Sequence, residues 1–251
     1  MDVKFPEGFY FGSATSATQA EGAHTADHKA PDIWDLWFEE EPYKFHGGVG
    51  PADTSTFFEH WREDIELLHE TGQNSFRTSI SWSRLLPDPE GDPNPEAVEF
   101  YCNVFGTLRD EGVEPFVNLF HFDMPVALQE RGGWESREVV DLYERYARIA
   151  FELFGDVVKR WYTFNEPIVH VECGYLQQYH YPCKVDPKAA VQVAYHTALA
   201  SALAVMRSCP TPRSASCSTS RPPIRVPTIP PTSVPPTSPS SSPTRASSTR
   251  A

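Results

Sequence analysis

The residues best suited to chemistry follow a run of aromatic and β-branched residues, Trp161-Tyr162-Thr163-Phe164, which is typical of a short strand. Asn165 and Glu166 come next, and Pro167 prevents simple continuation of the strand. Because a proline restricts the residue before it to extended backbone, we expect Glu166 to be fixed where the strand stops. A carboxylic acid held there, beside an amide that can bind a hydroxyl group, suits cleavage of a glycosidic bond. A solvated surface glutamate fits the same motif, so the rest of the chain has to decide.

The elements that position these residues alternate along the chain. We expect strands over residues 7–14, 74–80, 115–120 and 160–165, and helices over residues 54–71, 95–111, 136–154 and 187–206. Ser136 is the expected amino cap of the third helix, and Gly112 the expected end of the second. Four strand–helix units in order predict a parallel sheet covered by helices.

Two architectures fit this order: a doubly wound open sheet, or half of an eight-stranded β/α barrel. Arg77 lies on the second strand and His121 ends the third, so reactive side chains come from several successive strands. This distribution favours the barrel. A nucleotide-binding fold is unsupported, because the glycine-rich segment at residues 47–50 falls in a loop and not after the first strand.

Composition divides the chain at residue 207. Residues 1–207 hold all 34 acidic residues against 16 lysines and arginines, together with every aromatic residue and every histidine. Residues 208–251 hold no acid and no aromatic residue, but 11 prolines, 12 serines, 7 threonines and 5 arginines. Such a segment buries too little apolar surface to offset its ordering entropy, so we expect a disordered tail after a structured body.

The same numbers limit the partners and the compartment. An acidic body argues against nucleic acid and against an anionic membrane surface. We find no signal-peptide pattern at the amino terminus and no apolar run approaching the length of a membrane span. Five cysteines lack the spacing of a disulfide framework. These features predict a cytoplasmic protein.

Other constellations carry less chemistry. His24, His28 and His46 share a polar loop with Asp27 and Asp32, but without metal-ligand spacing. The segment His170-Val171-Glu172-Cys173 superficially matches a zinc deaminase motif, yet no paired cysteines follow, and we interpret it as ordinary loop. Cys173 has no evident base partner. We therefore expect neither a metal nor a cofactor.

Four segments together resemble glycoside hydrolase family one, the β-glucosidase and 6-phospho-β-glucosidase family. They are FPEGFYFGSATSATQAEGA (5–23), FRTSISWSRLLPD (76–88), LFHFDMPVALQERGGW (119–134) and WYTFNEP (161–167), in the family's order and spacing over roughly residues 5–206. The resemblance implies a (β/α)8 barrel that hydrolyses β-glycosides with retention. It also implies two catalytic glutamates about 5–5.5 Å apart, one acting as acid/base and one as nucleophile.

The resemblance assigns roles residue by residue. Glu166 matches the acid/base, and Asn165 matches the amide that holds the sugar's 2-hydroxyl. Gln19 and His121 match groups that bind other ring hydroxyls, and Arg77 resembles the arginine that positions the nucleophile. Singly, each of the last three has a structural alternative: a helix cap, a satisfied buried histidine and a core ion pair.

Differences from the family pattern narrow the expected class of substrate. Phe122 stands where many members have Trp, and His180-Tyr181-Pro182-Cys183 replaces a His-Ala-Pro-Gly turn. With Gly174-Tyr175-Leu176, these variants resemble the branch that acts on 6-phosphorylated sugars, although Phe122 could equally be a neutral exchange. A β-glucosidase for unphosphorylated sugars and a non-catalytic carbohydrate-binding fragment are the alternatives.

The resemblance stops near Met206-Arg207, before the strand that carries the nucleophile in the family. We therefore expect residues 1–207 to form the first four units of the barrel, with a frameshift near residues 206–209 producing residues 208–251. A genuine Pro/Ser/Thr linker is the competing interpretation. Without a nucleophile, the 251-residue chain is expected to fold poorly and to have negligible glycosidase activity.

Overall fold

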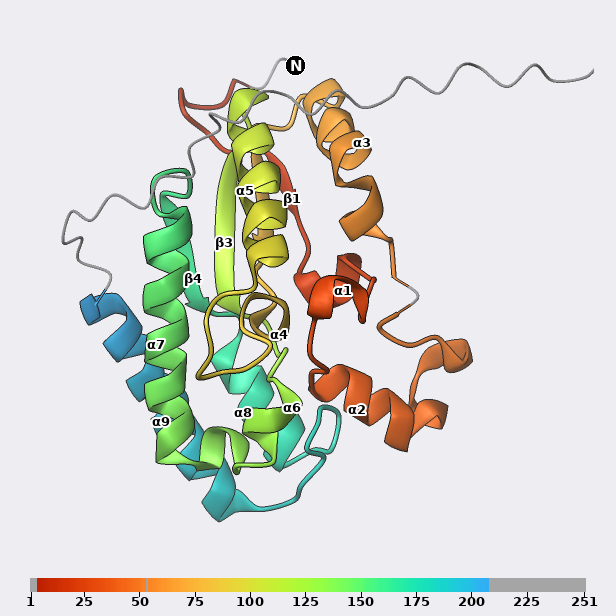
Figure 1. The fold of residues 1–251 in the computed structure, drawn as a ribbon, viewed down its shortest axis with the longest axis vertical. Helices are drawn as coiled ribbons and strands as arrows, with labels where there is room; N and C mark the ends of the chain where they lie inside the picture. The colour runs from red at the N-terminus through yellow and green to blue at the C-terminus, as the bar shows by residue number, and fades with distance from the viewer. Residues whose placement is uncertain (1–3, 53, 208–251) are drawn as a thin grey trace, which may run out of the picture. The chain divides into compact units, whose positions relative to one another are not determined.

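The computed structural model describes residues 4–52 and 54–207, which belong to one compact unit. Its centre is a sheet of four parallel strands in sequence order, seen in Figure 1: β1 (Gly12–Ala14), β2 (Ser75–Ser79), β3 (Glu114–Phe120) and β4 (Arg160–Phe164). Gly12 lies opposite Ser75, and Phe120 lies opposite Phe164. Parallel strands in sequential order are the arrangement expected of part of a β/α barrel. The tail assigned to residues 208–251, and the expected frameshift, lie outside the described residues.

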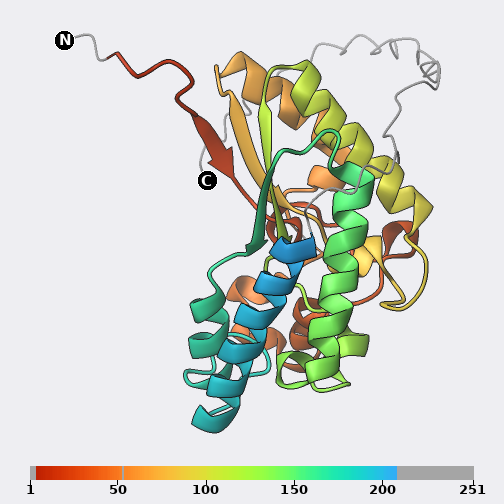
Figure 2. The ribbon, with the colours of Figure 1, turned by 90° about the vertical axis from the view of Figure 1, so that its left-hand side faces the viewer.

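Four long helices follow the strands, as the sequence predicts. They are α3 (Phe57–Glu70), α5 (Pro95–Asp110), α7 (Arg137–Phe154) and α9 (Pro187–Arg207). Each helix in this series contacts the next one, and Figure 2 shows α7 and α9 side by side. Gly112 ends the α5 turn with a φ of +74°, which confirms the predicted carboxyl cap.

Short helices occupy the connections. They are α1 (Ala17–Ala20), α2 (Ile33–Glu40), α4 (Trp82–Leu85), α6 (Val126–Gln129) and α8 (Pro167–Tyr175), with 3-10 turns η1 (Ala26–His28), η2 (Pro42–Lys44), η3 (His46–Gly48) and η4 (Gly133–Glu135). All of them fall within the connections that lead from the carboxyl end of a strand to the next long helix, and η4 lies further along the β3–α7 connection than α6. Because active sites of such folds are built from these connections, the short helices are the part of the fold that shapes a site.

A buried aromatic layer fixes the carboxyl ends of the strands. The Trp82 ring stacks on Tyr146 at a centroid distance of 4.9 Å, and both side chains are fully buried. The Tyr146 hydroxyl donates to the carbonyls of Ile80 and Leu119, at 3.2 and 2.9 Å. Tyr143, also on α7, donates to the carbonyl of Thr163. One helix therefore holds three strand ends in place through aromatic packing and satisfied hydroxyl groups.

The first strand is shorter than expected. Only Gly12–Ala14 pair with β2, because backbone groups of the preceding residues form hydrogen bonds with the Asn74 side chain instead of with a strand. Its Oδ1 accepts from the Phe11 amide at 2.7 Å, and its Nδ2 donates to the Phe9 carbonyl at 2.9 Å. At Gly12 a Cβ atom would lie 2.0 Å from the Ser75 carbonyl oxygen, so the close approach of β1 to β2 requires glycine.

One local expectation is wrong, and another holds in position only. Residues 170–173 are not loop but part of helix α8, because Pro167 occupies the first helical turn, where proline is tolerated. Ser136 stands at the amino cap of α7, but its side chain makes no capping hydrogen bond.

The expectation that no apolar run reaches membrane-spanning length is also wrong. Residues 187–206 of α9 are long and apolar enough to cross a membrane by length and composition alone. Core helices pass the same test, and Val193, Ala200 and Ala204 of α9 are buried. The helix is therefore weak evidence for a membrane segment.

Candidate active site

Residues of three strands meet at the carboxyl end of the sheet, through one backbone bond and one side-chain bond. The Asn165 amide, just after β4, donates to the carbonyl of Phe120 on β3 at 2.9 Å. From β2, Arg77 Nη2 donates to Asn165 Oδ1 at 2.6 Å. Asn165 is buried, and this bond fixes its amide so that Nδ2 faces other partners. The structure thus brings Arg77 and Asn165 together; in residues 4–52 and 54–207 no ion pair forms on Arg77.

Glu166 is the amino-cap residue of helix α8 and is exposed. The expectation of an extended backbone is wrong, because Glu166 has φ +40° and ψ +60°, in the left-handed region. A non-glycine residue held there is strained, and such strain gathers at functional sites. The Asn165 Nδ2 donates to Glu166 Oε2 at 3.4 Å. The left-handed turn therefore presents the carboxyl group beside the Asn165 amide.

His121 directly follows β3 and is a buried, neutral imidazole. Its Nδ1 lies within hydrogen-bond distance of the Asn118 side-chain amide, 3.3 Å from Nδ2, and the imidazole tautomer sets which ring nitrogen carries the proton. Burial, then the charges of Arg77 and His180, lower the pKa of His121 to about 4. At neutral pH the side chain is therefore an uncharged hydrogen-bond donor, which suits a neutral hydroxyl group.

An aromatic wall stands next to His121. The Phe122 ring lies 4.9 Å from His180 and 5.2 Å from His121. His180 in turn lies 5.2 Å from the Trp34 ring of α2. Burial lowers the pKa of His180, and the charge of Glu166 acts in the opposite direction. Flat apolar rings beside neutral donors are the usual lining of a small-molecule site.

Gln19 lies on α1, after β1. The Gln19 amide donates to Ser16 Oγ at 3.3 Å, and Ser16 Oγ donates to Gln19 Oε1 at 3.0 Å. Ser16, not Gln19, is thus the helix cap, which removes the structural alternative for Gln19. The other atom of the Gln19 side-chain amide, Nε2, remains available to donate to a ligand, and Gln19 is exposed.

These residues line one cavity of about 490 Å³, within the roughly 300–1,000 Å³ typical of ligand sites. Five of the seven expected site residues line it directly: Gln19, His121, Phe122, Glu166 and His180. The remaining two, Asn165 and Arg77, are hydrogen-bonded to each other next to Glu166. The loop histidines 24, 28 and 46 do not line the cavity.

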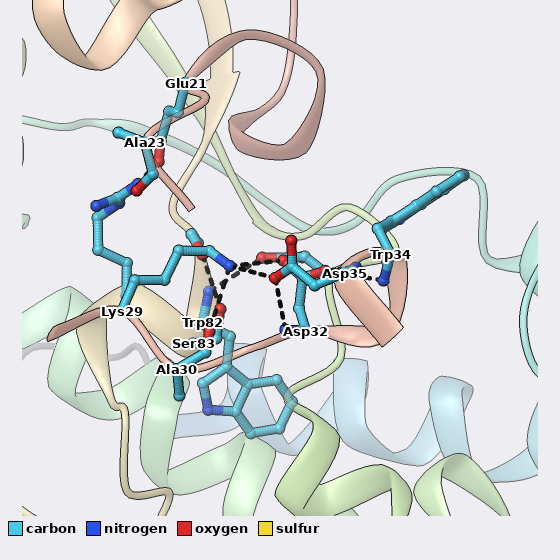
Figure 3. A network of polar contacts seen from close by, with 12 residues as sticks. Glu21, Ala23, Lys29, Ala30, Asp32, Trp34, Asp35, Trp82 and Ser83 are labelled. Carbon is cyan, nitrogen blue, oxygen red and sulfur yellow. Dashed lines mark hydrogen bonds and ion pairs between the residues drawn. The ribbon is translucent and has the colours of Figure 1, made fainter. Parts of the chain in front are cut away.

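Sequence reasoning missed part of the cavity lining, which Trp34, Phe45 and residues 49–51 provide. Trp34 is placed by the amino cap of α2, where Asp32 Oδ1 accepts from the Trp34 amide at 2.8 Å and the Asp35 side chain accepts from the Asp32 amide at 3.0 Å. Figure 3 shows Lys29 reaching both carboxylates, at 3.2 and 2.9 Å. The spacing of Asp32 and Asp35, an acidic residue three positions after the amino-cap residue, was the signal available for this cap.

Two features limit the chemistry. Across residues 4–52 and 54–207, no group of three or more His, Cys, Asp or Glu side chains is arranged to hold a metal ion. Among the described lining residues, Glu166 is the single carboxylate. The described cavity can therefore bind hydroxyl groups and exchange one proton, but a two-carboxylate reaction needs a second acid from elsewhere.

The fold and the site define a class: part of a β/α barrel with a carboxylic acid and hydroxyl-binding groups at its strand ends. The family model for glycosyl hydrolase family 1 matches residues 1–220, and the chain belongs to this family.

Proteins with similar sequences and structures belong to the same family. The chain is 59% identical over 202 residues to the 6-phospho-beta-glucosidase GmuD of Bacillus subtilis strain 168, covering 80% of this chain and 43% of that protein. It is 40% identical to Beta-glucosidase A of Thermotoga maritima, over 82% of this chain and 46% of that one. The solved family 1 β-glucosidase from Thermotoga maritima superposes with a TM-score of 0.79 at 39% identity, over 82% and 46% of the two chains. The chain thus spans about half the length of the relatives it matches.

Proposed function

We propose that this chain carries the acid/base and the sugar-binding residues of a retaining β-glucosidase, with 6-phosphorylated β-glucosides as the substrate class. The observation that carries the proposal is the cavity itself, in which Glu166 faces the neutral donors His121 and Gln19. Neutral donors and an aromatic wall fit a sugar ring, and a single proton donor beside them fits the glycosidic oxygen.

The chemistry follows from the residues. Glu166 would donate its proton to the leaving glycosidic oxygen as the bond to the anomeric carbon breaks, and would later take a proton from the attacking water. Asn165 would hold the 2-hydroxyl with Nδ2, because Arg77 occupies its Oδ1. The nucleophile that receives the sugar must lie outside the described residues, so the chain by itself is expected to bind and not to turn over.

The substrate class rests on softer observations. Phe122, the turn at His180 and residues 174–176 resemble the phosphosugar branch, and GmuD, at 59% identity, is named a 6-phospho-beta-glucosidase. An unphosphorylated β-glucoside is the second candidate, which the 40% identity to Beta-glucosidase A favours. A non-catalytic carbohydrate-binding role is the third, which the single carboxylate in the cavity favours.

The proposed binding is tested by titrating the 251-residue chain with a slowly hydrolysed aryl 1-thio-β-glucoside, with and without a 6-phosphate. Binding is followed through the imidazole resonances of His121 and His180. Both should shift saturably, while exposed His69 on α3, which lies outside the cavity, should not. A His121→Ala variant should lose most of the affinity. The proposal fails if neither cavity histidine responds, or if His69 responds equally.

A further inference from the structure

The turn that follows β3 holds an unusual backbone. Phe122 has a φ of +68°, in the left-handed region that a bulky aromatic residue rarely adopts. Its ring is nevertheless buried and forms part of the cavity wall. A conformation of this kind persists only where the surrounding structure determines it strongly. Something next to Phe122 must therefore hold the turn.

Asp123 makes the contacts that do so. Its Oδ1 accepts from the His121 backbone amide at 3.0 Å, which closes the turn around Phe122. Its Oδ2 accepts from the Trp82 backbone amide at 3.0 Å, at the start of α4. One carboxyl group thus joins the connection after β3 to the connection after β2. The Asp123 side chain is fully buried, so water does not replace either bond.

A second layer holds the other side of the same turn. The Ile33 amide donates to the Met124 carbonyl at 2.9 Å, and the Val126 amide donates to the Pro31 carbonyl at 3.0 Å. These bonds dock the turn against the amino cap of α2, where Asp32 shares Lys29 with Asp35 (Figure 3). The cap also carries Trp34. Two aromatic lining residues of the cavity, Trp34 and Phe122, are therefore tied to the turn that contains Asp123.

Buried Asp123 has no counter-charge within the described residues, where no Lys, Arg or His side chain forms an ion pair with it. Burial, and then the charge of Asp32, raise the pKa of Asp123 to about 7. A buried carboxyl group without a counter-charge is costly. Its two oxygens instead accept hydrogen bonds from two backbone amides, and a hydrophobic side chain has no acceptor to replace them.

We propose that Asp123 is a positioning residue for the sugar site: it holds the strained turn that places His121 and Phe122 in the cavity. The inference rests on the proposed function for its purpose, but the positioning itself is independent of sugar. Asp123 acts through His121 and Phe122 and does not line the cavity.

Asp123→Asn leaves one acceptor oxygen where two amides need one each. The turn should loosen, His121 should become more hydrated, and the His121 pKa measured by NMR should rise from about 4 toward its ordinary value. Affinity for the 1-thio-β-glucoside should fall at least about tenfold. Asp186→Asn is the matched control, because Asp186 Oδ1 also accepts two backbone amides at 3.0 Å, but at the start of α9. That control should leave the His121 pKa unchanged.

A measurement without substitution covers the case in which Asp123→Asn does not fold. Hydrogen-bonded amide protons report the ionisation of their acceptor, so the His121 and Trp82 amide protons should titrate together between pH 5 and 9. An unchanged His121 pKa in a folded Asp123→Asn protein, or His121 and Trp82 amide protons that titrate at different pH values, would overturn the inference. If the amides titrate and the His121 pKa moves, but the wild-type chain binds no sugar, the positioning holds and the proposed function fails.

Discussion

Protonation of His170 should destabilise the fold strongly in mild acid. His170 lies in α8, only 3% exposed, with its ring stacked 6.1 Å from Phe122 and edge-on to Phe120 at 5.8 Å. Its Nδ1 is buried and has no hydrogen-bond partner among the described residues. Burial, then the charge of His180, lower the pKa of His170 to about 3. The folded state therefore binds a proton at this site far less readily than the unfolded chain does.

The direction and size of this loss of stability follow from the difference in the His170 pKa between the folded and unfolded states. The folded pKa is depressed, so the stabilisation is fully present above the unfolded value of about 6.5 and is lost as the pH falls toward 3. One pKa unit corresponds to 1.36 kcal/mol, so protonation of His170 should lower the free energy of unfolding by about 3 kcal/mol between pH 6.5 and pH 4. This is a large part of the roughly 5–15 kcal/mol of a typical domain.

The assay is urea unfolding, followed by tryptophan fluorescence at several pH values, of the wild type and of His170→Phe. Phenylalanine suits the aromatic surroundings and does not titrate. Asp123 acts in the opposite direction, because its raised pKa favours the fold in acid, but it is present in both proteins and cancels. The wild type should lose about 3 kcal/mol more than His170→Phe over this pH range. Equal losses in the two proteins would refute the reasoning.

Three other outcomes are expected. Glu21→Gln should lower the free energy of unfolding by about 3–5 kcal/mol, because it leaves buried Arg84, now paired at 2.9 Å, without a counter-charge; a drop below about 1 kcal/mol in urea unfolding would contradict this. Gly12→Ala should cost about 3 kcal/mol through the clash of its Cβ with the Ser75 carbonyl, measured as a lower melting temperature, and an unchanged melting temperature would count against the close β1–β2 approach. Sequencing the coding DNA through codons 200–260 should reveal a single-base shift that restores a strand-end glutamate in another frame, and the absence of any such frame would exclude the frameshift.

The regular elements could be predicted because their hydrophobic periodicity is strong. Helices α3, α5, α7 and α9 and strands β2 to β4 lie within three residues of the expected bounds, since packing and propensity agree there. The predicted first strand was too long because the Asn74 side chain, and not a neighbouring strand, binds the Phe9 carbonyl and the Phe11 amide. Such competition by a side chain leaves no periodic signal.

Candidate site residues could be predicted where the residue type and its place at a strand end indicate a role. They could not be predicted where the role depends on backbone conformation or on long-range contacts. Glu166, Asn165 and His121 stand at strand ends and were found. The left-handed backbone of Glu166 and Phe122 was not, because the rule for residues before proline predicts extended backbone and Phe122 has no local signal at all. Asp123 was also missed as a positioning residue. Its role depends on Trp82, 41 residues away, which only the folded chain brings within hydrogen-bond distance.

Whether Glu166 protonates the leaving group decides the proposed function. The measurement is glycoside cleavage by this chain mixed with the carboxyl-terminal half of GmuD, to which the family resemblance assigns the nucleophile. Substrates are p-nitrophenyl and 2,4-dinitrophenyl β-glucosides, each with and without a 6-phosphate. The mixture should cleave the phosphorylated pair faster. Glu166→Gln should slow p-nitrophenol release by about 10²–10⁴-fold, and dinitrophenol release much less, because the more acidic phenol needs no proton to leave. Equal slowing of both leaving groups, or none, would contradict the acid/base role.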